Sequence, residues 1–302
     1  GIMVFGAFVG VLCIRLFLAA GFPPEAGQLL LIIVILITML FGGLFALLLA
    51  YASINLKADQ TIGGTALNLL APALVLFLIL IISQQNVLNI DSMYSSADLF
   101  MLFQEDFGLG TKMENPLGVI GNILFNKVFL TTIYAIVLYV VLSIILYKTK
   151  LGLRLRSCGE HPQAAASLGI NVYKMRYIGT IISRCLAAFG GFIYALTAAG
   201  CTSNGDVAGL GFLALAVMIF GNWKPVPIAL AALLFGALKC ISVGYQYIDF
   251  NGDGVYALAN LGIGSHIYRI LPYVITLVVL AFTSKKSRAP KAEGQPYDKE
   301  QR

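Results

Sequence analysis

Residue types that could carry out metal or covalent chemistry are few and scattered in this 302-residue chain. Its two histidines, His161 and His266, lie far apart, and its five cysteines form no pair with the spacing of a metal site. Residues 249–254 match the first half of a calcium-binding loop, but Asn260 stands where such loops use a glutamate. Asn-Gly and Asp-Gly also form good turns, so we interpret this segment as a turn, with calcium binding as the alternative. We expect neither a metal nor a cofactor.

The motifs of nucleotide-driven and hydrolytic enzymes are absent from the sequence. There is no glycine-rich phosphate loop ending in Gly-Lys-Ser or Gly-Lys-Thr, no Gly-x-Ser-x-Gly turn and no His-Glu-x-x-His. We therefore do not expect this chain to be an enzyme. If ATP drives its activity, another chain hydrolyses the ATP.

The composition is that of a membrane protein. Hydrophobic residues make up 59% of the chain and charged residues only 11%, whereas soluble proteins carry roughly 25% charged residues. The net charge of +6 could indicate nucleic-acid binding, but the basic residues concentrate in residues 147–177 and after Thr283. This distribution fits membrane topology better than a nucleic-acid surface. We predict an all-α polytopic membrane protein with no nucleic-acid partner.

About eight membrane crossings are predicted from apolar runs, because a span needs about 20 residues. The run 210–220 is too short to cross alone, and either gains length from residues 205–209 or forms a half-helix buried in protein. The chain begins inside an apolar run, so we expect a further span before Gly1 and a parent of nine or ten helices. One membrane domain, residues 1–283, is followed by a polar tail, residues 284–302. The runs are 1–20, 29–53, 61–83, 119–146, 178–199, 210–220, 226–245 and 267–282.

The most distinctive polar stretch is residues 147–177, which carries six basic residues against a single acid, Glu160. A short basic loop between apolar runs faces the cytoplasm, because Lys and Arg resist translocation, and we expect the tail on the same side. Residues 162–168 are rich in alanine and predict a short helix, with Pro162 in its first turn and Gly169 at its end. We hypothesise that a cytoplasmic motor moves the membrane domain through this helix.

Polar residues inside the spans are candidates for a transport pathway. Asn68 and Thr65 lie in the run 61–83, and Asn222 lies in a turn after Phe220. An amide such as Asn68 can hydrogen-bond a neutral solute or a neighbouring helix, and the sequence leaves both open. The well-defined spans contain no Asp or Glu, which weighs against an ion-coupled secondary carrier.

Several stretches together resemble a known family. Gln163-Ala164-Ala165, three further residues and Gly169 resemble the Glu-Ala-Ala-x-x-x-Gly signature of ABC importer permeases, with glutamine in place of glutamate. The longer phrase, residues 152–172, is similar to the branched-chain amino acid, ribose and nucleoside group of these permeases. Residues 53–72 and 271–292 resemble the nucleoside uptake permeases in particular. The resemblance covers essentially the whole chain and departs at residues 249–254 and in the acidic stretch 84–116.

This resemblance implies a permease subunit of the bacterial plasma membrane that passes nucleosides, purine nucleosides foremost, into the cell by alternating access. The implied partners are a cytoplasmic ABC ATPase, a second and non-identical permease subunit, an extracellular substrate-binding lipoprotein and a small-molecule solute. Alternatives are the same machine carrying ribose or a branched-chain amino acid, a secondary carrier, and a purely structural subunit. The residues implied to couple to the ATPase are Glu160, His161, Pro162, Gln163, Ala164, Ala165 and Gly169, within a coupling segment of residues 148–176.

Overall fold

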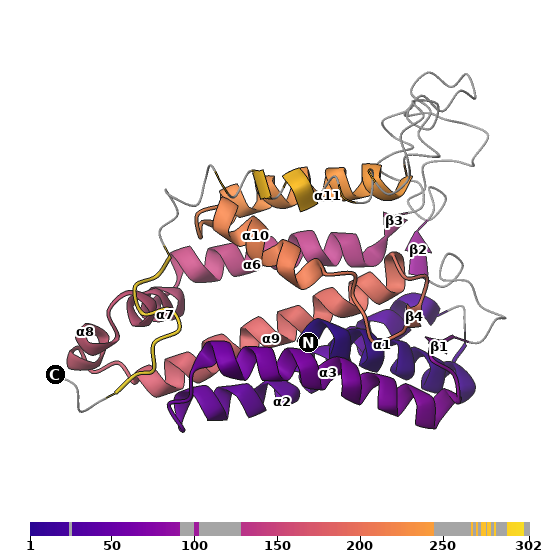
Figure 1. Ribbon diagram of the computed structural model, residues 1–302, viewed down its shortest axis with the longest axis horizontal. Coiled ribbons are helices and arrows are strands. Elements are labelled where there is room, and N and C mark those ends of the chain that lie inside the picture. The colour runs from indigo at the N-terminus through magenta and orange to yellow at the C-terminus, as the bar shows by residue number, and fades with distance from the viewer. Residues whose placement is uncertain are drawn as a thin grey trace, which may run out of the picture. The chain divides into compact units, whose positions relative to one another are not determined.

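The computed structural model describes residues 1–23, 26–90, 100–102, 128–244 and 289–298, together with positions 267, 270, 273–275, 277–278 and 281. Helices dominate the described residues (Figure 1). Six of them are long and apolar enough to cross a membrane: α1, α2, α3, α6, α9 and α11. The helices are α1 (Ile2–Ala19), α2 (Gly27–Ile54), α3 (Gln60–Ser83), α6 (Leu130–Lys148), α7 (Lys150–Glu160), α8 (Pro162–Ser167), α9 (Val172–Thr197), α10 (Leu210–Phe220) and α11 (Pro225–Gly244).

The chain forms two compact units, Gly1–Val207 with Ala292–Arg302, and Ala208–Lys291. In the first unit, α1 packs against α9, α2 and α3, and α9 also packs along α2. Small residues bring these helices close together, as is usual between membrane helices. A side chain at Gly191 of α9 would overlap the main chain of Met3 in α1, and one at Gly6 of α1 would overlap the main chain of Ala188. Glycine therefore allows α1 and α9 to approach closely beside an apolar core that includes Phe8 and Phe192.

Short strands connect the ends of the helices in the first unit. Strand β1 (Leu88–Asn89) pairs antiparallel with β4 (Thr202–Ser203), so the segment after α3 is joined to the segment after α9. Strand β2 (Met101–Leu102) pairs antiparallel with β3 (Val128–Phe129), directly before α6. The first pairing joins two segments that lie more than a hundred residues apart in the sequence, because Leu88 pairs with Ser203.

In the second unit, α10 and α11 form a helical hairpin around a small apolar cluster. Val217, Ala231 and Phe235 are buried in it, and the ring of Phe220 meets that of Phe235 edge to face at 6.1 Å. The turn between the helices includes two consecutive residues, Asn222 and Trp223, with positive φ angles of 50° and 59°. Such angles are unfavourable for a bulky residue, so this turn is conformationally strained.

Most of the predicted apolar runs correspond to observed helices. In the run 119–146, residues 119–127 lie outside the described residues, Val128 and Phe129 form β3, and α6 begins only at Leu130. The runs 1–20, 29–53, 61–83 and 226–245 match α1, α2, α3 and α11 to within two residues at each described end, and 210–220 matches α10. The described residues exclude residues 249–254, most of residues 84–116 and part of residues 267–282. Helix α9 begins at Val172, six residues before the predicted start at 178, because Asn171 caps it: its side-chain Oδ1 accepts a hydrogen bond from the Lys174 N–H at 3.0 Å.

Candidate coupling site and transport pathway

The coupling segment begins with a sharp corner between α6 and α7. Thr149 has an extended backbone and caps α7, because its Oγ1 accepts a hydrogen bond from the Gly152 N–H at 3.3 Å. The same hydroxyl donates to the Ile145 carbonyl at 2.6 Å. A side chain at Gly152 would overlap the carbonyls of Ile145 and Leu146, so only glycine allows this close approach of α7 to the end of α6.

Helix α8 has well-defined signals at both ends. Pro162 occupies its first turn, where the missing N–H costs nothing. At the other end, the Ile170 N–H donates to the Ala165 carbonyl at 3.1 Å and the Gly169 N–H to the Ala166 carbonyl at 3.0 Å. This pair of bonds, with Gly169 at φ +80°, is the Schellman motif that ends a helix at a glycine. The sequence prediction of a helix between Pro162 and Gly169 is confirmed.

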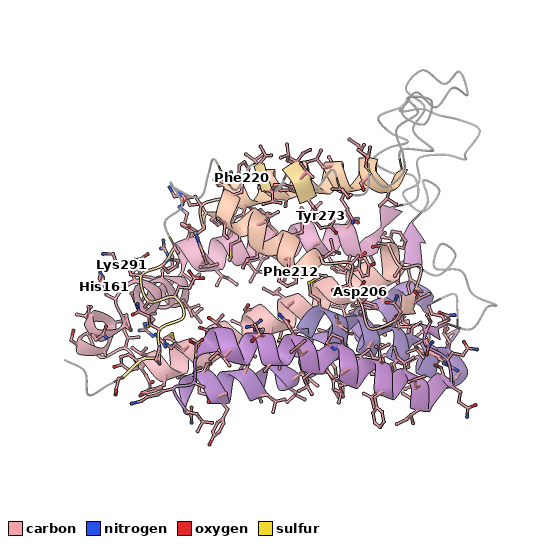
Figure 2. All side chains as sticks on the ribbon, viewed as in Figure 1. His161, Asp206, Phe212, Phe220, Tyr273 and Lys291 are labelled. Atoms are coloured by element: carbon pink, nitrogen blue, oxygen red, sulfur yellow. The ribbon has the colours of Figure 1, made fainter. Side chains whose placement is uncertain are left out.

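One face of α8 is buried and the other is exposed. Pro162 and Ala165 are buried, and Ala165 belongs to an apolar cluster with Cys158 of α7 and with Val172 and Met175 of α9. The opposite face is open, and Leu168 at its end is 81% exposed. This exposed side chain is available for contact with another molecule. The other exposed residues of this part of the chain are Glu160, His161, Gln163, Ala164, Ser167 and Gly169 (His161 is marked in Figure 2).

Exposed basic residues lie on both sides of α8 in the chain. Lys150, Arg154 and Arg156 of α7 are exposed, and the Arg156 guanidinium lies 4.6 Å from the centre of the Tyr147 ring. Lys174, in the first turn of α9, is also exposed. The cluster beneath these basic residues is apolar instead, and burial there raises the pKa of the Cys158 thiol. The segment therefore presents a basic outer surface over an apolar interior.

Two of the predicted pathway residues, Thr65 and Asn68, lie three residues apart on α3 and are both exposed. The buried stripe of this helix runs through Leu67, Ala71, Val75 and Ile79. The Thr65 hydroxyl donates to the Ile62 carbonyl at 2.8 Å, and Asn68 Oδ1 accepts a hydrogen bond from the Gly1 nitrogen at 2.8 Å. Pro72 has no N–H for the Asn68 carbonyl, so α3 carries an extra hydrogen-bond acceptor at this level.

The third predicted pathway residue, Asn222, belongs to the second unit. It is half-buried, and its N–H donates to the Ile219 carbonyl at 3.1 Å at the end of α10. Its neighbour Trp223 has a buried indole Nε1 with no hydrogen-bond partner. Thr65 and Asn68 share one helix face, whereas Asn222 belongs to the second unit, and the pathway role of all three stays a prediction.

Comparison with known proteins identifies the family. Residues 1–280 match the family described as "Branched-chain amino acid transport system / permease component". The chain belongs to this family. The permease is 39% identical over 299 residues to the "Nucleoside ABC transporter permease protein NupC" of Lactococcus lactis, covering 99% of this chain and 86% of the relative. It is 37% identical over 304 residues to the "Guanosine ABC transporter permease protein NupQ" of Bacillus subtilis, covering 100% and 87%.

A third relative comes from the same Lactococcus strain as NupC. The permease is 25% identical over 276 residues to the "Nucleoside ABC transporter permease protein NupB", covering 91% of this chain and 70% of the relative. No solved structure gives a significant match to the permease. These findings confirm the predicted all-α membrane fold and the resemblance to ABC importer permeases.

Sequence reasoning missed two parts of the permease that bear on α8. Helix α7 was included in a loop, although the spacing of Leu151, Leu155 and Cys158 is helical and Thr149 precedes it as a cap. Tyr297 was assigned to a polar tail, although it is 6% exposed and packs in the cluster around Ala165. A lone aromatic residue in a polar tail was the available signal.

Proposed function

We propose that this permease is the membrane subunit through which an ATP-driven importer passes nucleosides into a bacterial cell, with purine nucleosides as the preferred cargo. The observation that carries the proposal is the open face of α8, which ends in the exposed Leu168 and stands on a cluster shared with α7 and α9. The sequence holds no phosphate loop, so a separate ATPase supplies the energy. The proposed contact residues are the exposed Glu160, His161, Gln163, Ala164 and Gly169, whereas Pro162 and Ala165 are buried and are proposed to hold α8 in place from its inner face.

The transport step needs no covalent chemistry from this chain. ATP closes the motor subunits, α8 moves with them, and the spans change from outward-open to inward-open. Each ligand state only has to bind one conformation better than the other. The basic coupling segment and the tail lie on the cytoplasmic side of the plasma membrane in this proposal, because short Lys- and Arg-rich loops resist translocation.

Both the proposed pathway residues and the relatives support a nucleoside as the cargo. Thr65, Asn68 and Asn222 offer hydroxyl and amide groups rather than fixed charge, which suits a neutral solute with several hydrogen-bonding groups. The names of NupC and NupQ refer to nucleoside and guanosine transport. An extracellular lipoprotein delivers the solute, and a second, non-identical permease completes the pathway. Lactococcus lactis has two permease relatives, NupC and NupB, which supports a pair of unlike subunits.

A branched-chain amino acid is the second candidate cargo, because the family description names that class. Uptake of labelled guanosine, uridine, leucine and ribose should be measured in cells with and without the gene for this chain. We expect guanosine uptake to require both the chain and ATP. Accumulation of leucine or ribose alone would move the cargo assignment to that solute, and unchanged uptake of all four would point to a structural subunit.

Asn68 provides a residue-level test of the pathway. Asn68→Ala removes one neutral hydrogen bond to the proposed solute, worth about 0.5–1.5 kcal/mol, and should raise the KM for guanosine roughly 2- to 10-fold. Leu69→Ala is the matched control, because Leu69 is the next residue on the same helix, is 78% exposed and has no hydrogen-bonding group. Equal KM values for Asn68→Ala and the unmodified permease would remove Asn68 from the pathway without affecting the cargo assignment.

A further inference from the structure

The last described residues of the chain, 292–298, lie across the coupling segment (Figure 1). We call them the tail strap. The Ala292 N–H donates a hydrogen bond to the Gly159 carbonyl at 3.0 Å. Gly159 is in the last turn of α7, where carbonyls lack partners within their own helix. The tail strap therefore supplies a capping donor to α7, immediately before α8 begins.

Tyr297 is the apolar anchor of the tail strap. It is 6% exposed and belongs to the same cluster as Ala165 of α8, Cys158 of α7 and Met175 of α9. Its ring meets that of Tyr173 edge to face, with centres 5.2 Å apart and planes at 70°. This T-shaped geometry is favourable for aromatic pairs. The cluster that holds α8 in place is thus completed by a side chain from the end of the sequence.

Arg176 of α9 fixes the tail strap by two contacts. Its guanidinium donates to the Gln295 carbonyl at 2.8 Å and lies 5.8 Å from the centre of the Tyr297 ring. A charged donor makes a stronger hydrogen bond than a neutral one, and the second contact is in the range of a cation–π interaction. The two contacts hold both the main chain and the ring of the tail strap against the start of α9.

The end of the tail strap extends to the loop between α2 and α3. Asp298 pairs with Lys57 of that loop at 2.8 Å. The pair is partly exposed, so it contributes little stability and mainly fixes position. In addition, the Tyr177 hydroxyl of α9 donates to Asn55 Oδ1 at 2.7 Å, in the same loop. The tail strap therefore spans from the end of α7, over α9, to the helix pair α2 and α3.

We propose that the tail strap is a docked positioning element for α8, with Tyr297 as its positioning residue. It locks α7, α8 and the start of α9 into one body and links that body to the α2–α3 loop. A displacement of α8 is then carried to the membrane helices instead of being lost in a local movement. The link to transport rests on the proposed function, whereas docking of the tail strap is a property of the permease alone.

Docking can be measured through Cys158, which is buried in the cluster with Tyr297. In the assembled transporter, the other cysteines of the chain would be replaced by alanine and the rate of maleimide labelling at Cys158 followed. Deletion of residues 292–302, and separately Tyr297→Ala, should speed labelling at least about tenfold, which corresponds to about 1.4 kcal/mol in local opening. Tyr297→Phe keeps the ring and should label as slowly as the unmodified chain. Equal labelling rates in all four proteins would overturn the proposal. The replaced cysteines are Cys13, Cys185, Cys201 and Cys240.

The positioning role is measured as solute imported per ATP hydrolysed. Tyr297→Ala should lower this ratio while the transporter still hydrolyses ATP, and Tyr297→Phe should restore it. Gln295→Ala is the matched control, because its side chain is exposed and only its main-chain carbonyl contacts Arg176. An unchanged ratio in Tyr297→Ala would refute the positioning role. Failure of the unmodified transporter to import nucleoside would instead count against the proposed function, and the labelling result would still decide whether the tail strap docks.

Discussion

Replacing Gly169 by alanine should slow ATP-driven uptake, because Gly169 ends α8 in a conformation that other residues resist. Its φ is +80°, and a Cβ placed there would meet no atom within 4 Å. The substitution therefore causes no clash, and its whole cost is the left-handed backbone, about 1–2 kcal/mol. That cost lowers the ratio of correctly ended to frayed α8 by a factor of about 5–30. Leu168, the exposed apolar residue just before it, would lose its fixed position.

The chain contains a matched control for this strain. Gly21 has φ +84° and also has open space where a Cβ would lie, but it follows α1 and is not in the coupling segment. Gly21→Ala should therefore carry the same backbone cost with little change in uptake. Gly169→Asn should retain more activity than Gly169→Ala, because asparagine tolerates this conformation better than alanine.

The assay is the initial rate of guanosine uptake per transporter, with solute capture by the extracellular binding protein measured in parallel. We expect Gly169→Ala to reduce uptake severalfold and to leave capture unchanged. If Gly21→Ala and Gly169→Ala reduced uptake equally, the effect would be one of general stability, and the assignment of α8 as the coupling element would be refuted.

Three further predictions concern Leu168, Gly191 and Asp59. Leu168→Ser removes an apolar side chain whose burial is worth about 1.5–3 kcal/mol, so it should weaken ATPase binding roughly 10- to 100-fold without lowering the Tm of the isolated permease; an unchanged Kd would place the ATPase contact elsewhere. Gly191→Ala should lower the Tm in detergent and Gly236→Ala should not, because the new Cβ overlaps Met3 in the first case and meets open space in the second. Asp59 caps α3 and accepts hydrogen bonds from two backbone N–H groups, which lower its pKa. A lowered pKa means that the capping stability is present above the unfolded pKa of about 3.9 and is lost as the pH falls through the folded pKa. Asp59→Asn keeps a side-chain oxygen that can cap α3, whereas Asp59→Ala does not. Amide exchange in the first turn of α3 should be faster in Asp59→Ala than in Asp59→Asn at neutral pH, and similar rates would contradict the capping role.

Much of this permease follows from its sequence, because the relevant signals are local. Apolar runs of membrane-spanning length predicted the helices, since a bilayer imposes both length and composition on a span. Pro162 and Gly169 predicted the ends of α8, because proline fits the first turn of a helix and glycine adopts positive φ at little cost. The coupling role of this segment rests on its resemblance to the permease signature and stays a prediction.

The tertiary structure decided which of these residues act together. No local signal tells that Ala165 faces a cluster while Leu168 faces outward, because that depends on how α7 and α9 pack around α8. Nor does the sequence indicate that Gln295 meets Arg176, which lies 119 residues earlier in the chain. Such contacts depend on the shapes and polar groups of distant segments, and these meet only when the chain has folded.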